Sequence, residues 1–315
     1  MNPNYQKHFP VMLPEVLKYL APQDGQTYVD ATFGNGGYSE AILQAADCKV
    51  IALDRDPNVA ARAAELQAQY GKRFEFRAGR FGDLADLVQE NIDGAVFDIG
   101  VSSMQIDQAE RGFSFAKDAP LDMRMSQSGQ SAADLVNSLP EAELADIIYN
   151  YGEERKSRQI ARRIVETRKT APIQTTKELA DLVCSVVHRS GDGINPATRT
   201  FQALRIAVND ELGELQSGLA AAAQKLAAGG RLVVVDFHSL EDRIVKTFFK
   251  NNTGKTRHVS RYRTETQPQD DGMIFAECSK AIVPSEEELK INARSRSAKL
   301  RYAVKSPNFQ KEFKA

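Results

Sequence analysis

The feature that most constrains the fold is a glycine-rich turn near the N-terminus. The stretch Tyr28-Val29-Asp30-Ala31-Thr32-Phe33-Gly34-Asn35-Gly36-Gly37-Tyr38-Ser39 begins with strand-forming residues and runs into three glycines within four positions. It continues into the helix-like run Glu40–Ala46. This succession predicts a strand, a tight turn and a helix start. Since glycine lacks a Cβ and tolerates positive φ, a ligand can approach the backbone of such a turn closely.

A second strand follows at the spacing of a nucleoside-binding fold. Lys49–Leu53 is mostly apolar, with β-branched Val50 and Ile51, and Asp54 follows it. An acidic residue about 20 positions after a glycine turn, at the end of the next strand, is where a pair of ribose hydroxyls is held. The pattern therefore predicts an adenosine-containing cofactor.

The spacing of the glycines separates two classes of cofactor. A dinucleotide fingerprint needs G-x-G-x-x-G, and here Ser39 stands where the third glycine belongs. Asp30, four residues before Gly34, fits the D-x-x-x-G-x-G turn of S-adenosylmethionine enzymes better. A glycine turn that binds no ligand is the alternative reading, because short motifs match by chance.

Near-continuous apolar strands alternate with helices through the first hundred residues. The pattern predicts strands at Phe74–Arg77 and Gly94–Gly100, and another at Arg231–Phe237. It is typical of an α/β fold in which a doubly wound, mostly parallel sheet is covered on both faces. Ligands bind at the carboxyl ends of such strands. We therefore expect one crevice to gather Asp30, Asp54, Phe81 and Asp98.

The strand signal disappears in the middle of the chain, where helical periodicity takes over. We expect an inserted all-helical domain over residues 107–214 and a discontinuous α/β domain over 1–106 and 215–315. One long amphipathic helix is predicted from Ala197 to Leu226, closed by Gly229-Gly230. The last strands are predicted around Met273–Phe275 and Lys299–Val304, after a loop over 251–271.

Composition bounds the class of protein. The 315 residues suggest about two domains, and no apolar run is long enough to span a bilayer. The polar first ten residues favour a cytoplasmic protein. Three dispersed cysteines offer no metal-ligand spacing, so no metal is expected.

The charge distribution is more informative than the net charge of −1. Two basic clusters could each form a phosphate-binding face, or could be solvated surfaces with balancing acids. They are Arg155, Lys156, Arg158, Arg162, Arg163, Arg168 and Lys169, and Lys290, Arg294, Arg296, Lys299, Arg301 and Lys305.

Longer motifs resemble those of one known family. They include Asp98-Ile99-Gly100-Val101-Ser102-Ser103-Met104-Gln105, Arg111-Gly112-Phe113-Ser114-Phe115, Pro120-Leu121-Asp122-Met123-Arg124-Met125, Pro196-Ala197-Thr198-Arg199 and Asp236-Phe237-His238-Ser239-Leu240-Glu241-Asp242-Arg243. Together they resemble the bacterial small-subunit rRNA (cytosine-N4)-methyltransferases called family H, or MraW. The resemblance runs through essentially the whole chain. Two departures are Tyr38 and Asn195, at positions where the family often has His.

The resemblance implies a Rossmann-like S-adenosylmethionine-dependent methyltransferase. Its acceptor would be N4 of a cytidine, at position 1402, in the decoding region of 16S rRNA, within the small ribosomal subunit or its precursor. Carried over motif by motif, the cofactor contacts would be Gly36, Gly37, Tyr38, Asp54, Phe81, Asp98 and Gln105. The sequence leaves both a monomer and a homodimer open.

The expected chemistry needs acceptors beside a poorly nucleophilic amine, and neither a metal nor a covalent nucleophile. We expect the amine to dock at Asp98, Ser102 and Ser103, although Asp98 could serve the cofactor alone and the serines could merely cap a turn. Candidate RNA contacts are Arg111, Phe113, Arg124, Arg199, His238, Arg243 and Arg294, each with a structural role as the alternative.

Two other functions stay open from the sequence. One is a methyltransferase that acts on DNA or another amino acceptor through the same cofactor site. The other is a non-catalytic assembly factor that binds RNA through its basic clusters.

Overall fold

The computed structural model describes residues 9–188, 195–254, 273–307 and 309. The chain divides into two compact units. Unit 1 comprises residues 1–100 and 212–315, and unit 2 comprises 101–211. Most of the loop expected over 251–271 lies outside the described residues. Among the helices in the described ranges, none is both long and apolar enough to cross a membrane.

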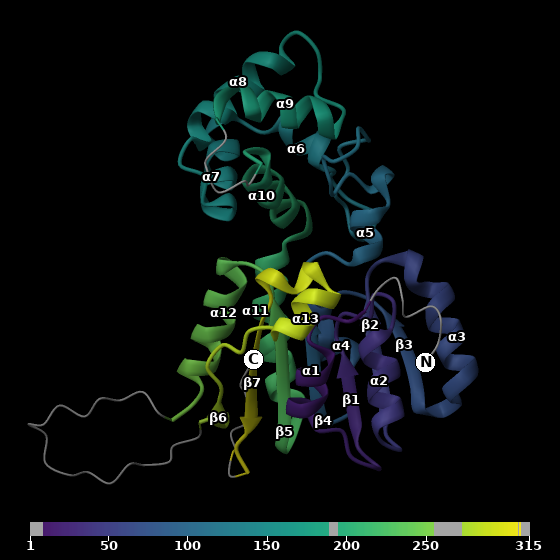
Figure 1. Cartoon of the computed structure of the whole chain (residues 1–315). Coiled ribbons are helices and arrows are strands. Elements are labelled where there is room, and N and C mark those ends of the chain that lie inside the picture. Colours follow the sequence, from purple (N-terminus) through teal and green to yellow (C-terminus); the bar gives the residue numbers. More distant parts are fainter. Residues whose placement is uncertain (1–8, 189–194, 255–272, 308, 310–315) are drawn as a thin grey trace, which may run out of the picture. The chain divides into compact units, whose positions relative to one another are not determined.

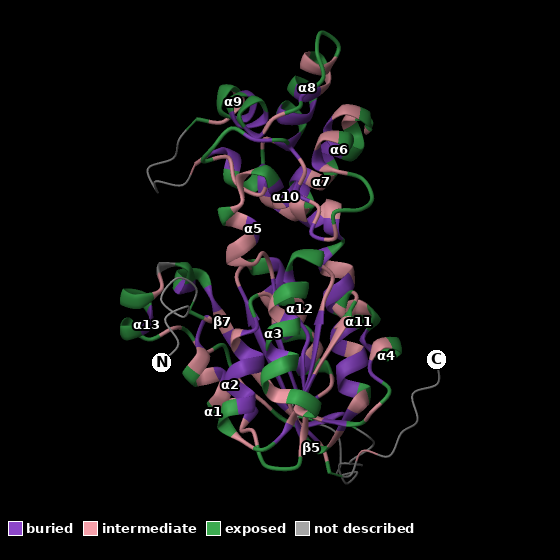
Figure 2. Cartoon of the chain, turned by 90° about the vertical axis from the view of Figure 1, so that its right-hand side faces the viewer, coloured by how far each residue is buried: buried purple, intermediate pink, exposed green. Residues whose placement is uncertain are grey.

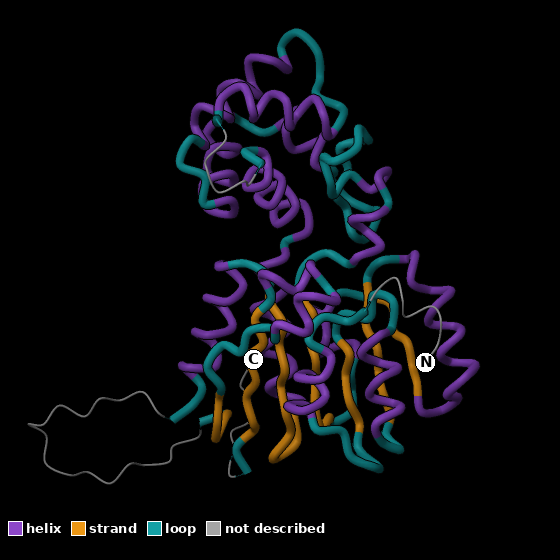
Figure 3. Tube along the Cα trace, viewed as in Figure 1, coloured by secondary structure: helices purple, strands orange, loops and turns teal. Residues whose placement is uncertain are grey.

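Within the described residues, unit 1 is built on one seven-stranded sheet in the order β3-β2-β1-β4-β5-β7-β6 (Figure 1, Figure 3). Strands β1 to β5 are parallel, whereas β7 runs antiparallel to both of its neighbours. The strands are β1 (Thr27–Asp30), β2 (Lys49–Asp54), β3 (Phe74–Ala78), β4 (Ile92–Asp98), β5 (Leu226–Asp236), β6 (Phe275–Cys278) and β7 (Lys299–Lys305). The expected doubly wound, mostly parallel sheet is confirmed.

Helices cover both faces of this sheet (Figure 2). On one face, apolar residues of α4, α11 and α12 pack against β4 and β5 around buried Phe97 and Val234. On the other face, Leu20 of α1 and Tyr28 lie so close to Gly94 that a Cβ there would approach them within 2.8 Å. The helices of this unit are α1 (Leu13–Leu20), α2 (Gly37–Ala45), α3 (Ala60–Tyr70), α4 (Leu84–Leu87), α11 (Glu211–Lys225), α12 (Ser239–Asn251) and α13 (Glu286–Ile291).

Strand register aligns the acidic strand ends. Asp30 pairs with Ala52 and Val96 in the neighbouring strands, and Asp98 pairs with Val235. Because these strands are parallel, their terminal aspartates all lie at the same edge of the sheet. This carboxyl edge is where the ligand crevice was expected.

Unit 2 is helical. Its core is a cluster of buried aliphatic side chains, among them Ile148, Ile160, Ile164 and Leu204. Helices α6 to α10, whose bounds follow, contribute apolar residues at three- and four-residue spacing to this core. The helices are α5 (Ser103–Asp107), α6 (Ala132–Ser138), α7 (Glu141–Gly152), α8 (Ser157–Arg168), α9 (Thr176–Val186) and α10 (Ala197–Asn209).

The prediction of one long helix from Ala197 to Leu226 is wrong. It is two helices, α10 and α11, because Asp210 adopts the left-handed conformation with φ 50° and ends α10. Asn209 holds the break, since its side chain donates to the Met123 carbonyl and accepts from the Met125 amide, at 2.8 and 2.9 Å. Gly229-Gly230 lies within β5 rather than closing a helix.

Candidate functional site

The turn between β1 and α2 is tied to the neighbouring strand β2. The Phe33 amide donates to the Leu53 carbonyl at 2.9 Å, and the Gly34 amide donates to Oδ2 of Asp54 at 2.8 Å. The turn is thus held by backbone and side chain at once. This fixes its position relative to the acidic end of β2.

Two glycines in the turn are required by geometry. Gly36 has φ 75°, and a Cβ there would lie 2.8 Å from the Phe33 ring. At Gly37, a Cβ would overlap the Pro10 ring at 2.3 Å. Larger residues would therefore displace either the turn itself or the N-terminal segment that covers it.

Tyr38 turns its side chain into the protein. The ring is buried, and its hydroxyl donates to the Val11 carbonyl. Met12, next in the chain, donates its amide to Oε1 of Glu288 on α13 at 3.1 Å. The side chain of Tyr38 thus anchors the N-terminal segment, which leaves only its backbone for a contact with a ligand in the turn.

Asp54 has acceptor capacity to spare. Its Oδ2 accepts from Gly34, and its Oδ1 accepts from the Asp56 amide at 2.9 Å. An ionised carboxylate offers about four lone-pair sites, so about two remain for a pair of hydroxyl donors. Burial raises the pKa of Asp54, and these amide hydrogen bonds oppose the rise.

Asp30 is fully buried and its carboxylate is satisfied. Its Oδ2 accepts from the Ser39 hydroxyl at 2.6 Å and from the Ser39 amide at 3.1 Å. Burial nevertheless raises its pKa to about 6. Asp30 therefore clamps the start of α2 against the end of β1.

Asp98 is a poorly compensated acid on this edge. Its amide donates to Oγ1 of Thr32 at 2.7 Å, which places the residue beside the glycine turn. The Oδ1 atom is buried, and no group in the described part of the chain donates to it. Burial, followed by repulsion from Asp30 and Glu241, raises its pKa to about 8. A cationic ligand beside Asp98 would stabilise its ionised carboxylate.

Asp236, at the carboxyl end of β5, is a residue that the sequence analysis did not single out as a site. It is fully buried, and neither carboxylate oxygen accepts a hydrogen bond within the described residues. Burial is the main cause that raises its pKa to about 8, with Asp242 and Glu241 adding to it. The signal was available, because Asp236 ends an apolar strand just as Asp98 does.

Phe81 follows β3 and is half-buried. Its ring meets that of Phe97 edge-on, with centroids 5.7 Å apart. Gly218 on α11 permits this position, since a Cβ there would lie 2.8 Å from the Phe81 ring. The ring is thus held rigidly at the carboxyl edge, where it can serve as an apolar wall.

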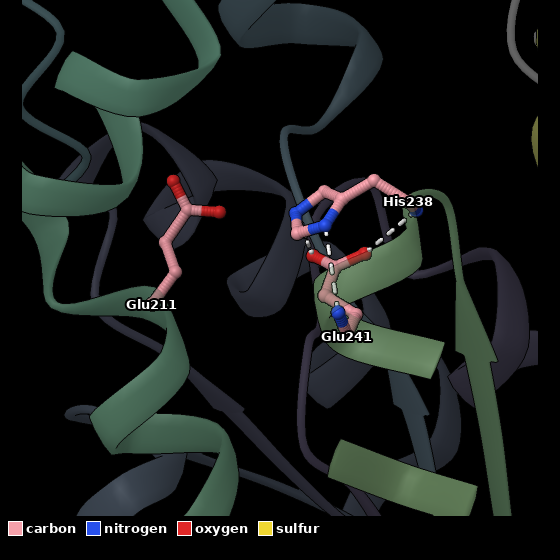
Figure 4. A group of neighbouring side chains, drawn as sticks. All are labelled: Glu211, His238 and Glu241. Carbon is pink, nitrogen blue, oxygen red and sulfur yellow. Dashed lines mark hydrogen bonds and ion pairs between the residues drawn. The ribbon is translucent and has the colours of Figure 1, made fainter. Parts of the chain in front are cut away.

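His238 lies just after β5 and caps α12 (Figure 4). Its Nδ1 accepts from the Glu241 amide at 3.4 Å, and Oε2 of Glu241 accepts from the His238 amide at 3.2 Å. Nε2 lies 3.1 Å from Oε1 of Glu241. These contacts give the imidazole a structural role in starting the helix.

The remaining catalytic and cofactor candidates belong to unit 2. Ser102 caps α5, where its hydroxyl accepts from the Gln105 amide at 3.2 Å. Oε1 of Gln105 accepts from the Ser102 amide at 3.0 Å and completes a capping box. Ser103 is half-buried, and within the described residues its hydroxyl makes no hydrogen bond. Unlike the two residues of the box, it keeps its hydroxyl available.

Two of the RNA candidates in unit 2 are occupied by internal contacts. Arg111 is buried and donates to the carbonyls of Arg124 and Met125, both at 3.0 Å, with its guanidinium over the Phe113 ring. Arg124 pairs with Asp122 at 2.6 Å. These contacts stabilise the 111–125 loop.

Three arginines of the candidate set are more accessible. The side chain of Arg199 is 55% exposed and lies 3.9 Å from Glu154. Arg243 on α12 and Arg294 near α13 are exposed as well. A phosphate could reach these three without unfolding the protein.

Taken together, the carboxyl edge of unit 1 suits an adenosine ligand that carries positive charge. The positive-φ glycine turn admits a ligand close to the backbone, and Asp54 can accept from two hydroxyls. Asp98 supplies a carboxylate without a cationic partner beside it. S-adenosylmethionine has a ribose, a sulfonium and an ammonium, so the residues present fit it.

Comparison with known proteins gives one family over nearly the whole chain. The model of the "MraW methylase family" matches residues 5–306. A protein of Paramagnetospirillum magneticum named ribosomal RNA small subunit methyltransferase H is 56% identical over 306 residues, covering 96% of each chain.

Proteins of the same name in other bacteria are similarly close. That of Rhodospirillum rubrum is 55% identical, over 96% of this chain and 95% of its own. That of Rickettsia massiliae is 54% identical, over 95% of this chain and 98% of its own. These alignments span both units.

Proposed function

Because the chain belongs to the MraW methylase family, we propose that it transfers a methyl group from S-adenosylmethionine to the N4 amine of a cytidine in 16S rRNA. Family membership and the names of the relatives support rRNA methylation. The choice of N4, of cytidine and of position 1402 in the decoding region rests on the motif resemblance. We place the reaction in the cytoplasm, on the small subunit or its precursor.

One structural observation carries the cofactor part of this proposal. Asp98, at the end of β4, presents a carboxylate without a neutralising cation, beside a turn that only glycine can form. In the bound state, Asp54 would accept from the ribose hydroxyls, and Phe81 would form an apolar wall against the adenine. The backbone of Gly36, Gly37 and Tyr38 would face the methionine moiety. Bound S-adenosylmethionine supplies an electrophilic methyl group.

The chain's task at the acceptor is to position the amine and to take up its proton. The N4 lone pair is delocalised into the ring, so positive charge grows on nitrogen as the methyl group arrives. An acceptor fixed beside the amine stabilises that charge. We propose Asp98 for this role, with Ser103 as a further acceptor; Ser102, the other serine expected here, already accepts from the Gln105 amide. The transfer breaks the S–CH3 bond, forms an N–CH3 bond and releases one N–H proton to the acceptor.

We propose that helical unit 2 holds the RNA. Enzymes that modify a base must take it out of its stack, which requires contacts on both sides of the target nucleotide. The exposed Arg199 is a better candidate for such a contact than Arg111 or Arg124, which stabilise their own loop.

The two alternatives from the sequence make different predictions for the product. A methyltransferase for DNA or another amine would leave the rRNA unmodified. A non-catalytic assembly factor would bind the subunit without consuming S-adenosylmethionine, yet the turn and its acids are all present in this chain.

The proposal is tested by incubating purified protein with S-adenosylmethionine and small subunits that lack the modification. Nucleosides released from the rRNA are then separated by chromatography and identified by mass spectrometry. We expect N4-methylcytidine to accumulate up to one molecule per small subunit. Product at another atom or base would refute the N4 assignment, and no product on rRNA would refute the function.

A further inference from the structure

One helix of unit 2 carries an unusual concentration of exposed positive charge. Helix α8 buries Ile160, Ala161 and Ile164 in the core of its unit. Five basic side chains are exposed on its solvent side, just before its start and just after its end. These are Arg155, Arg158, Arg162, Arg163 and Lys169, which we call the α8 basic face.

Two basic residues of the same stretch do not belong to this face. Arg168 donates to the carbonyls of Val136 and Leu139, both at 2.7 Å, and so caps the end of α6. Lys156 donates from Nζ to the Val186 carbonyl at 3.1 Å. Both side chains are consumed by internal backbone acceptors. The basic cluster around α8 looks uniform in sequence, but the structure separates it into the exposed α8 basic face and two side chains that bind backbone carbonyls.

The α8 basic face is largely uncompensated. Within the described residues, Arg155, Arg158, Arg163 and Lys169 take part in no ion pair. Arg162 lies 3.7 Å from Glu141, and its side chain is 70% exposed, so this pair is weak. Glu166 is an exposed acid on the helix itself. A surface with this excess of like charge favours an anionic partner.

The shape of the face selects a phosphate backbone over a membrane. A helix that lies on a bilayer exposes its apolar side to the lipid, and the apolar side of α8 is already buried in the unit. From Arg158 to Lys169 the helix rises by about 16 Å at ~1.5 Å per residue, which is long enough to follow several phosphates of one strand. Arginine suits such contacts because its planar guanidinium binds phosphate in a bidentate manner.

We propose that the α8 basic face binds the phosphate backbone of the rRNA substrate. This inference rests on the proposed function and adds the surface of unit 2 that positions the RNA. The contacts are independent of sequence, so they set affinity and orientation rather than the choice of base.

The test compares Arg158→Gln/Arg163→Gln with a matched control, Lys72→Gln/Lys225→Gln. The control also removes two positive charges, at residues that precede β3 and β5 and thus lie at the opposite, amino edge of the sheet. The probe is a decoding-region rRNA fragment, titrated at several salt concentrations. Each lost phosphate contact should lower the steepness of log K against log salt by roughly 0.7–0.9.

For the α8 variant we expect at least about tenfold weaker binding at moderate salt and a raised KM with an unchanged kcat. The control should behave as wild type. Arg158→Lys/Arg163→Lys should restore the salt dependence, because it keeps the charges. Thermal unfolding should not change, since Arg158 and Arg163 make no ion pair in the described structure.

The outcomes separate this inference from the proposed function. If the wild type methylates rRNA and the α8 variant binds it with unchanged affinity and salt dependence, the α8 assignment is overturned and the function stands. Binding to anionic lipid vesicles that depends on α8, with RNA binding unaffected, overturns it in favour of a membrane. If the wild type neither binds nor methylates rRNA, the function itself fails, and the inference fails with it.

Discussion

At the scale of single residues, the carboxyl edge of the sheet holds buried carboxyl oxygens to which no group in the described residues donates a hydrogen bond. Asp98 and Asp236 both have pKa values raised to about 8, mainly by burial. Such a carboxyl costs stability when it ionises in the folded protein. A cofactor with a sulfonium and an ammonium would offset that cost at Asp98, so poor compensation in the free protein favours binding.

This arrangement predicts the pH dependence of stability. A carboxyl whose folded pKa lies above its unfolded value binds more protons when folded, so stability falls as pH rises between the two values. For Asp98 that window runs from about 4 to about 8, with a slope of at most about 1.4 kcal/mol per pH unit. Asp98→Asn should flatten the decline and raise the urea midpoint at pH 8.

The matched control is Asp86→Asn, which alters an exposed carboxyl on α4. It should leave the pH profile of the urea midpoint as in wild type. If Asp98→Asn keeps the wild-type decline between pH 5 and pH 8, Asp98 is not the uncompensated acid that we describe.

At the scale of elements, the break between α10 and α11 shows what a pattern of apolar residues can and cannot reveal. The spacing from Phe201 to Leu219 continues through the break, so periodicity alone predicts one helix. What ends α10 is the left-handed Asp210 and the contacts of Asn209 with the 123–125 loop. A contact between residues so distant in sequence leaves no local signal.

We therefore expect Asn209→Ala to destabilise the helical unit by about 2–6 kcal/mol. The substitution would leave the buried Met125 amide and Met123 carbonyl unsatisfied, at about 1–3 kcal/mol each. The loss of unfolding free energy is measured by denaturant titration, with hydrogen exchange of the α10 amides as the probe of this unit.

Asn150→Ala, at an exposed position of α7, serves as the control and should change stability little. Equal effects of the two substitutions would show that the side chain of Asn209 does not hold the break.

The parallel strands were predictable because each is a short apolar run that ends in a turn or an acid. β2, β4 and the final part of β5 lie where the sequence places them. The glycine turn also stands as expected, since Gly34 and Gly36 both have positive φ. By contrast, the contact of Pro10 with Gly37 and the hydrogen bond of Tyr38 to Val11 depend on tertiary packing.

At the scale of the whole molecule, the net charge of −1 hides an uneven distribution. The sequence located both basic clusters, but it could not separate solvent-facing arginines from those that cap helices. Arg168 and Arg163 look alike in sequence, and only the structure shows that Arg168 is bound to backbone carbonyls. Likewise, the role of His238 as a helix cap follows from the position of Glu241 in space.

At this scale we propose that unit 1 binds the methyl donor and that unit 2 binds the RNA, and the identity of the methylated nucleotide is what both proposals must explain. The most direct measurement is a map of modified cytidines in 16S rRNA from a strain that lacks this protein. We predict that the N4 methyl group in the decoding region disappears, and that it returns with the wild-type chain but not with Asp98→Asn. A decoding-region cytidine that keeps its N4 methyl group in the strain without the protein would contradict the account.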